Sequence, residues 1–380
     1  MFWFAVAILV LGVLVTIEAL VGNARIERLG DLPPRGPGPA PRLSVVVAAR
    51  DEERNIATAL RSLLAQDYPD FEVVVVDDRS TDQTGPILDR MAASDSRLQI
   101  VHVSVLPSGW LGKNHALQVG AGQASGEWIL FTDADIHMDP STFSRAIRFC
   151  AERGVDHLAI APKLILPGLL LEGFGVFFLW SFILFAKPWK ARDPNSWFHV
   201  GIGAFNLVRR TAYDTVDGHR PIRLRPDDDL KLGKLLKRAG FRQDALSGQG
   251  LLSVEWYHSL GEMILAFEKN MFAGVEYSVV LSLAGGLLQL AAGVVPIVAL
   301  GFTVGTTQLL LAAQVALGMA IFAKLARSID SRPVVALIYP IVVLLFVYIL
   351  WRTMLVNLVS GGIRWRGTFY PLRELKANRI

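Results

Sequence analysis

The sequence predicts an α/β domain with a parallel sheet, flanked by membrane-spanning helices, and three observations support this prediction. Long uncharged runs lie near both ends of the chain, whereas most of the charge lies in residues 43–270. In that central stretch, short runs of β-branched residues alternate with helical patterns, as in a parallel sheet with helices on both faces. Acidic residues follow three of these runs, at the positions where such sheets bind ligands.

Composition places the chain at a membrane. Its 380 residues are 52% hydrophobic and only 19% charged, which is more apolar than a typical soluble domain. Residues 2–21 form one apolar run broken only by Glu18, and further runs lie near 277–303, 308–326 and 334–357. Each run is long enough to cross a bilayer of about 30 Å.

The first run is expected to be an anchor rather than a signal peptide, because no basic segment precedes it and no clear cleavage site follows it. Arg25, Arg28, Arg35 and Arg42 come soon after it. By the positive-inside rule, they place the N-terminus outside and the central domain in the cytoplasm, at a bacterial inner membrane. The single cysteine, Cys150, permits no intrachain disulfide, which is consistent with that compartment.

The basic tail conflicts with this topology. Three spans after a cytoplasmic domain would leave the tail outside, but residues 358–380 are rich in Arg and Lys, which prefer the inside. Either one of the three runs does not cross or the tail violates the rule, and both alternatives stay open. A net charge of +4 suits an anionic membrane surface. No basic patch with interleaved aromatic residues indicates nucleic-acid binding.

These patterns predict six parts in the chain. They are an N-terminal transmembrane helix (1–22), a Pro-rich linker (23–42), the central α/β domain (43–255), an amphipathic interfacial helix (256–275), about three transmembrane helices (276–357) and a basic tail (358–380). Within the central domain, strands are expected at 43–47, 72–76, 98–103 and 128–133. Helices are expected at 52–65, from about 80 onward, and at 113–124.

Residues 133–135, Asp-Ala-Asp, end the last of these strands. Side chains two apart on a strand share a face, so Asp133 and Asp135 are expected to converge. Two carboxylates at a strand end favour Mg²⁺ or Mn²⁺, which would clamp a diphosphate. The alternative is a turn whose acids cap the next helix. His137 could be an extra ligand, although hard cations prefer oxygen.

Three strand ends carry polar residues at one edge of the predicted sheet: residues 48–52, 77–78 and 133–135. Five segments that include them resemble membrane-bound family 2 glycosyltransferases with a GT-A fold, a Rossmann-like nucleotide-sugar-binding domain. The segments are 45–52, 75–82, 112–117, 131–135, and 228–233 followed by 240–241. The resemblance is greatest to hopanoid- and carotenoid-associated glycosyltransferases, and ceramide glucosyltransferase is more distant.

The resemblance implies a role for each matched position. The residues that would hold the uracil and ribose of a nucleotide-sugar are Ala49, Arg50, Asp51, Glu52 and Asp78. Lys113 would approach the diphosphate or the base, Asp133 would lie near the ribose and the metal, and Asp135 would bind the metal. Alternatively, Asp51 and Glu52 are a helix cap and first-turn acids, and Lys113 is a solvated lysine at a helix start.

The acidic run 227–229 is matched to the family's second acidic pair, which lies eleven residues before a Gly that ends the following helix. Counting back from Gly240 assigns Asp229 as the second acid and Asp228 as the first. The family usually has Glu at the first position. Asp229 would be the general base that takes the proton from the acceptor hydroxyl. The alternative is a solvated acid cluster favoured by a helix dipole.

Two further features suggest the acceptor. The Gln-x-x-Arg-Trp motif of processive synthases does not occur in the sequence, which argues against polymer synthesis. Residues 169–189 and 256–272 read as helices lying at the membrane surface, with ordinary domain core as the alternative. We therefore expect an inverting, metal-dependent transferase that moves a sugar from a UDP-linked donor to a lipid. A polyprenyl-phosphate transferase and a non-catalytic nucleotide-sugar-binding scaffold are the other hypotheses.

Overall fold

The structure is a computed structural model that describes residues 1–34, 36 and 40–380. Arg35 and part of the expected Pro-rich linker lie outside the described residues. The chain forms two compact units, which we describe separately. The sheet unit comprises residues 25–163, 188–255 and 378–380, and the helical unit comprises residues 1–24, 164–187 and 256–377.

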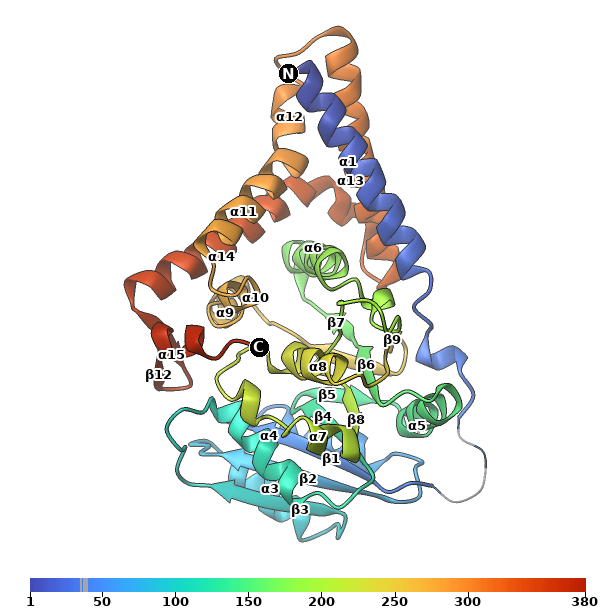
Figure 1. Ribbon diagram of the computed structural model, residues 1–380, viewed down its shortest axis with the longest axis vertical. Coiled ribbons are helices and arrows are strands. Elements are labelled where there is room, and N and C mark those ends of the chain that lie inside the picture. The colour runs from blue at the N-terminus through green and yellow to red at the C-terminus, as the bar shows by residue number, and fades with distance from the viewer. Residues whose placement is uncertain (35, 37–39) are drawn as a thin grey trace. The chain divides into compact units, whose positions relative to one another are not determined.

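The sheet unit contains a seven-stranded sheet in the order β3-β2-β1-β4-β8-β6-β9 (Figure 1). Its strands are β1 (Leu43–Ala49), β2 (Phe71–Asp78), β3 (Leu98–Val103), β4 (Trp128–Asp133), β6 (His157–Ala161), β8 (Asn206–Arg209) and β9 (Gln243–Ser247). Strands β1 to β4 pair in parallel, as expected. However, β8 runs antiparallel to both of its neighbours, β4 and β6. A parallel β8 would need a crossover helix on the sheet, but the helix between β6 and β8 belongs to the helical unit.

Helices cover the sheet because its central strands are apolar on both faces. All of Val73, Val74, Val75 and Val76 in β2 are fully buried. The helices of this unit are α2 (Ile56–Leu64), α3 (Thr84–Ala92), α4 (Gly112–Gln123), α5 (Thr142–Arg153), α7 (Arg210–Thr215) and α8 (Asp228–Arg238), with 3₁₀ turns η1 (Leu29–Asp31), η2 (Pro188–Lys190) and η3 (Arg220–Ile222). Beside the main sheet, β5 (Ile136–Met138) pairs with β10 (Leu252–Glu255). Strand β7 (Lys163–Ile165) spans the boundary between the units.

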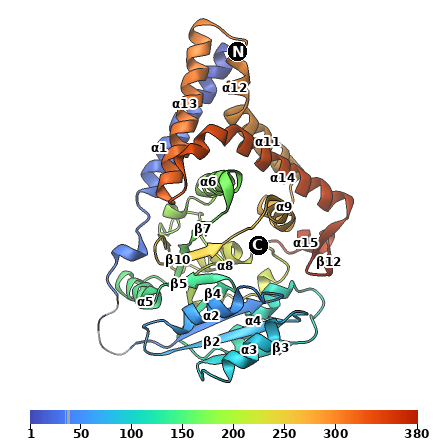
Figure 2. The same cartoon turned by 180° about the vertical axis from the view of Figure 1, so that it is seen from behind.

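The helical unit is built mainly from apolar helices. In chain order they are α1 (Phe2–Asn23), α6 (Gly168–Ala186), α9 (Leu260–Phe267), α10 (Met271–Gly274), α11 (Val279–Gly293), α12 (Val295–Ala299), α13 (Gly305–Ser328), η4 (Pro333–Ile338) and α14 (Tyr339–Val359). A hairpin of β11 (Gly362–Trp365) and β12 (Thr368–Pro371) and a last helix, α15 (Leu372–Ala377), complete the unit. Figure 1 and Figure 2 both show the N-terminal end of α1 beside α12, where Ala5, Ala299 and Leu311 form a buried cluster.

Four segments of the described chain are long and apolar enough to cross a membrane: Phe2–Asn23, Gly168–Lys190, Gly305–Ser328 and Pro333–Val359. The run 277–303, expected as one span, is divided between α11 and α12 at Val294. Pro296, two residues later, has no backbone N–H with which to continue the hydrogen-bond ladder of α11.

The segment 256–275, expected as one helix, contains α9 and α10 instead. Helix α9 ends before Glu268, whose carbonyl oxygen accepts a hydrogen bond from the side chain of Asn357 at 3.1 Å. That contact satisfies a carbonyl group at the helix terminus from outside the helix.

Candidate functional site

The site lies at the carboxyl ends of β1, β2 and β4. In the sheet register, Ala49 of β1 is level with Asp77 of β2, and Ala48 is level with Asp133 of β4. The three predicted strand ends are therefore neighbours at one edge. Ala49 is buried within β1, whereas Arg50, Asp51 and Glu52 follow the strand and are partly exposed.

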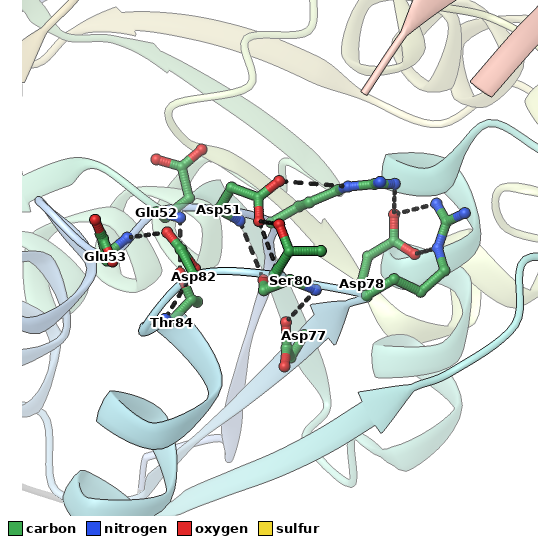
Figure 3. A network of polar contacts seen from close by, with 11 residues as sticks. Asp51, Glu52, Glu53, Asp77, Asp78, Ser80, Asp82 and Thr84 are labelled. Carbon is green, nitrogen blue, oxygen red and sulfur yellow. Dashed lines mark hydrogen bonds and ion pairs between the residues drawn. The ribbon is translucent and has the colours of Figure 1, made fainter. Parts of the chain in front are cut away.

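Two loops at this edge are tied together by hydrogen bonds between residues about thirty positions apart (Figure 3). Asp51 has a positive φ of 53°, its amide donates to the Ser80 hydroxyl at 3.1 Å, and its carboxylate accepts from the Thr81 amide at 2.7 Å. The Glu52 amide donates to the Thr84 hydroxyl at 2.8 Å. Because α2 begins only at Ile56, Asp51 and Glu52 do not cap it. The cap alternative is wrong, and Asp51 instead fixes the shape of the loop.

Asp78 is buried between two arginines at the end of β2. Arg79 donates to its two carboxylate oxygens at 2.8 and 3.0 Å, and Arg50 lies 3.7 Å away. Arg79 adopts a positive φ of 59° and makes these two bonds to the residue that directly precedes it. Gly112 is required beside this pair, because a Cβ there would lie 2.2 Å from the Asp78 carboxylate. The sequence motif marked Asp78, but it gave no indication of its bidentate partner.

Asp133 and Asp135 approach each other for a different reason from the one expected. Strand β4 ends at Asp133, and Asp135 lies in the turn between β4 and β5, so strand periodicity does not place it. Burial, followed by the negative charges of Asp133 and Glu52, raises the pKa of Asp135 to about 7. The helix-cap alternative is also wrong, because Asp139 accepts from Ser141 at the start of α5.

This pair fits a hard divalent cation, although it does not enclose one. Among the described residues, no three His, Cys, Asp or Glu side chains form a metal-binding group, so neither His137 nor Glu52 completes a cage around the two aspartates. Mg²⁺ is commonly bound through one or two carboxylates together with substrate phosphates. Burial and the neighbouring negative charges disfavour the ionised form of Asp135, and a bound cation would offset this unfavourable energy. A cation site needs such an excess of negative charge.

Lys113 connects the two acidic groups of the site. It lies in the first turn of α4, and its ammonium is 2.8 Å from Asp133 and 3.7 Å from Asp228. Burial alone lowers the pKa of Lys113, but the charges of Asp133, Asp228 and Asp229 raise it above its ordinary value. The side chain is only 24% exposed, so the solvated-lysine alternative is wrong.

Asp228 and Asp229 form the first turn of α8, and Asp228 is buried. One oxygen of Asp229 accepts from the Gly203 amide at 2.7 Å, and the other accepts from the Leu230 amide at 2.7 Å. Burial, followed by the charge of Asp228, raises the pKa of Asp229 to about 7. Gly240 follows the end of α8 with a φ of 86°, which agrees with the helix end used to count the acids.

The sequence analysis missed the segment 201–203, which joins the two acidic groups. The Asp133 amide donates to the Gly203 carbonyl at 3.1 Å, while the Gly203 amide donates to Asp229. A Cβ at Gly203 would lie 2.8 Å from the Asp133 carboxylate, and one at Gly201 would lie 1.9 Å from the Asp229 carbonyl. The Gly-Ile-Gly sequence before a short strand was the available signal of this close approach.

Comparison with known proteins identifies the domain that contains these residues. Residues 44–216 match the model of Glycosyl transferase family 2. A 4,4'-diaponeurosporenoate glycosyltransferase of Staphylococcus haemolyticus is 23% identical over 62% of each chain. The poly(ribitol-phosphate) beta-N-acetylglucosaminyltransferase TarS of Staphylococcus aureus is 38% identical over 32% of this chain and 21% of its own length. The matched segments thus span less than two thirds of both relatives.

One solved structure is similar in fold along most of the chain. The mannosyltransferase PcManGT of Pyrobaculum calidifontis, determined with GDP-Man and Mn²⁺, has a TM-score of 0.60 and 20% identity, and the match covers 92% of this chain and 98% of that one. This likeness confirms the expected α/β GT-A fold. The sequence match thus identifies residues 44–216 as a glycosyltransferase family 2 domain.

Proposed function

We propose that the chain is an inverting, metal-dependent glycosyltransferase that moves a sugar from a nucleotide-sugar to a membrane lipid. The observation that carries this proposal is the link between Asp133 and Asp229 through the backbone of Gly203. Asp133, expected at the donor side, bonds to the carbonyl group of Gly203, and Asp229, expected at the acceptor side, bonds to its amide group. Such a spacing suits a direct displacement between a bound donor and an incoming hydroxyl.

Asp229 is proposed as the general base. The amides of Gly203 and Leu230 donate hydrogen bonds to its carboxylate and fix its position. Its pKa is raised to about 7, which is close to neutral pH. A base with such a pKa accepts a proton from an attacking hydroxyl more readily than an ordinary aspartate does. Asp228 maintains this property through its negative charge, and Lys113 limits it. Displacement in one step needs no nucleophilic side chain.

On the donor side, the loops around Arg50, Asp51 and Asp78 are proposed to bind the base and ribose of a uridine diphosphate sugar. The resemblance of segments 45–52 and 75–82 to family members supports this assignment. Asp133 and Asp135 would hold Mg²⁺ or Mn²⁺, and a cation there would neutralise charge on the leaving diphosphate. The ammonium of Lys113, already beside Asp133, supplies a second positive charge at the same place.

A lipid acceptor is supported by the helical unit and by the name of one relative. The relative from Staphylococcus haemolyticus is named for 4,4'-diaponeurosporenoate, a carotenoid acid. This name supports an apolar acceptor but not a particular attacking group. A polyprenyl-phosphate acceptor is the second candidate, but a phosphate, like the carboxylate of a carotenoid acid, is already ionised and needs less base assistance. The raised pKa of Asp229 therefore favours a hydroxyl acceptor.

We place the sheet unit on the cytoplasmic side, with α6 in the membrane interface. Residues on both sides of α6 belong to the sheet unit, where β8 pairs with β4 and β6. If α6 crossed the membrane once, these paired strands would lie on opposite sides. Its basic end, at Lys187 and Lys190, suits the headgroup region.

Lipid analysis tests the proposed function directly. Lipids extracted from cells with and without the protein are compared by mass spectrometry for a species that gains one hexose or N-acetylhexosamine. The proposal predicts such a species only when the protein is present, and an Asp229→Asn variant must fail to produce it. If the lipid profiles are identical, the proposed lipid acceptor is wrong. Release of free nucleoside diphosphate without any glycolipid would instead indicate a hydrolase.

A further inference from the structure

The last three residues of the sequence are part of the sheet unit, although they follow the helical unit in the chain. The side chain of Asn378 bridges the backbone of the segment that precedes α8. Its oxygen accepts from the Leu224 amide at 2.9 Å, and its nitrogen donates to the Pro221 carbonyl at 2.7 Å. Two bonds to one segment fix that segment more firmly than a single bond would.

Ile380 makes a second contact with the same region. Its main-chain oxygen accepts from the Lys234 ammonium on α8 at 2.7 Å. Its side chain packs against the buried cluster that includes Ile222, Leu232 and Leu236. Residues 378 and 380 therefore hold both the segment 221–224 and the helix that follows it. Between them, Arg379 is exposed.

The segment 221–225 is also held from the active-site side. The buried side chain of Asn114 donates to the carbonyls of Ile222 at 2.7 Å and Arg225 at 2.9 Å. The Leu111 amide donates to the Arg223 carbonyl at 2.8 Å. Asn114 is the neighbour of Lys113 in α4, so one short segment contacts the helix that carries the lysine and the residues of the tail.

This segment leads directly into the acidic run. Arg225 is almost fully buried and donates to both carboxylate oxygens of Asp227, at 2.9 and 3.0 Å. Asp227 is the residue at the N-terminal end of α8, and Asp228 and Asp229 follow it. A displacement of residues 221–225 would therefore move the start of α8 relative to Gly203 and Lys113.

We infer that Asn378 and Ile380 are positioning residues for Asp229. They hold the segment 221–225 against α4, so that the first turn of α8 presents Asp229 to the acceptor. The inference rests on the proposed function, because Asp229 must be the base. The hydrogen bonds of Asn378 and Ile380 given above are made to the segment 221–224 and to Lys234 of α8, and not to the strand ends that are proposed to bind the donor. The effect of these two residues is consequently expected on the rate of transfer and not on donor binding.

The test compares Asn378→Ala and Asn378→Leu with the matched control Arg379→Ala in the purified full-length protein. Transfer is measured with whichever member of a panel of UDP- and GDP-hexoses the unaltered protein uses, and donor binding is measured by calorimetry with Mn²⁺ and the same nucleotide-sugar. Both Asn378 variants should lower kcat by about tenfold or more, because small misplacements of a catalytic group are costly. Donor affinity should change by less than twofold, and Arg379→Ala should match the unaltered protein.

Hydrogen exchange then separates positioning from general destabilisation. Faster exchange in the Asn378 variants should be confined to the amides of residues 220–230. Faster exchange throughout the sheet unit, or an equal loss of donor affinity and kcat, would overturn the inference. Local loosening with unchanged kcat would also overturn it, while the proposed function would stand. If the unaltered protein transfers no sugar, the proposed function fails, and the exchange result still shows whether the tail holds the segment.

Discussion

Asp135 and Asp229 are carboxyl groups whose surroundings oppose their ionisation. Burial is the largest cause for each, and a neighbouring aspartate is the next: Asp133 for Asp135 and Asp228 for Asp229. Lys113 lies between the two groups and favours the ionised form of both. Carboxyl groups whose pKa is strongly raised by burial and by neighbouring charges are typical of functional sites. Burying them costs stability, so a functional role explains why they are present.

The first prediction concerns the proposed metal ligand. Asp135→Ala should abolish the Mn²⁺-dependent part of nucleotide-sugar binding, because it removes one of the two carboxylates proposed to hold the metal and leaves Asp133 paired with Lys113. Calorimetry with a nucleotide-sugar, with and without Mn²⁺, measures this. Asp139→Ala is the matched control, since Asp139 lies at the start of α5 and contacts Ser141. An unchanged Mn²⁺ dependence in Asp135→Ala would exclude the proposed metal site.

The second prediction concerns pH. The base must be ionised to accept a proton, and the pKa of Asp229 is raised to about 7. At saturating donor and Mn²⁺, kcat should therefore reach a plateau above about pH 8 and fall by about tenfold for each unit below pH 7. The pH–rate profile provides the measurement. A rate that is constant from pH 5.5 to 8.5 would be inconsistent with Asp229 acting as the base.

At the scale of elements, the site depends on close backbone approach between segments that are distant in sequence. The segment 201–203 passes against the start of α8, and Gly201 meets the Asp229 carbonyl there. The 50–53 and 79–84 loops depend in the same way on bonds between Asp51, Ser80 and Thr81. At Gly201 there is no space for a side chain. In the two loops, a substitution that removes a hydrogen-bonding group would break a bond between them.

The third prediction compares Gly201, which has no space for a side chain, with Gly122, which has open space around it. Gly201→Ala should lower the melting temperature and the transfer rate together, because its Cβ would meet a backbone carbonyl that cannot move aside; overpacking of this kind costs about 1–3 kcal/mol. Gly122→Ala is the control, since Gly122 is an exposed residue of α4 with open space around it, and this change should stabilise the protein by up to about 1 kcal/mol. Thermal unfolding and transfer assays decide. Equal melting temperatures for the two variants would contradict the packing described for Gly201.

Strands and motifs of the sheet unit were predictable, because their signals are local. Runs of β-branched residues identified β1 and β2, and the distance to Gly240 assigned the acids in α8. The antiparallel direction of β8 could not be predicted, because it depends on which distant strands β8 lies between. The turn that holds Asp135 and the pairing of Arg79 with Asp78 are local, but they depend on backbone conformations that the residue types alone do not indicate.

For the whole molecule, the assignment of residues 378–380 to the sheet unit favours the same side of the membrane for the end of the tail and for that unit. These residues belong to the same unit as residues 25–163, so an even number of crossings must separate them from residue 255. The N-terminal end of α1 clusters with Ala299 and Leu311, which lie near the α12–α13 connection. If the N-terminus is outside, α11 and α12 together cross the membrane toward the outside, and α13 crosses back to the cytoplasmic side. Helix α14, although long enough to cross, is then expected to lie in the interface.

The fourth prediction tests this topology with single cysteines in a Cys150→Ala background. Glu152→Cys and Asn195→Cys are exposed positions on the two sides of α6, and Arg379→Cys is in the tail. All three should resist an impermeant thiol reagent on intact cells and react once the membrane is opened. Phe302→Cys, 86% exposed between α12 and α13, should react on intact cells. Labelling of only one of positions 152 and 195 on intact cells would mean that α6 crosses.

The central claim is that Asp229 activates a lipid hydroxyl toward a bound nucleotide-sugar. The most direct measurement compares the unaltered protein with Asp229→Asn, both in lipid nanodiscs that contain the host lipid extract, with Mn²⁺ and the preferred nucleotide-sugar. We predict equal donor affinity by calorimetry, and transfer to lipid that is slower in the variant by about 10²–10⁴-fold, because the amide is nearly isosteric but cannot accept the proton. Near-normal glycolipid formation by Asp229→Asn, with loss of transfer in Asp228→Asn instead, would contradict the assignment of the base.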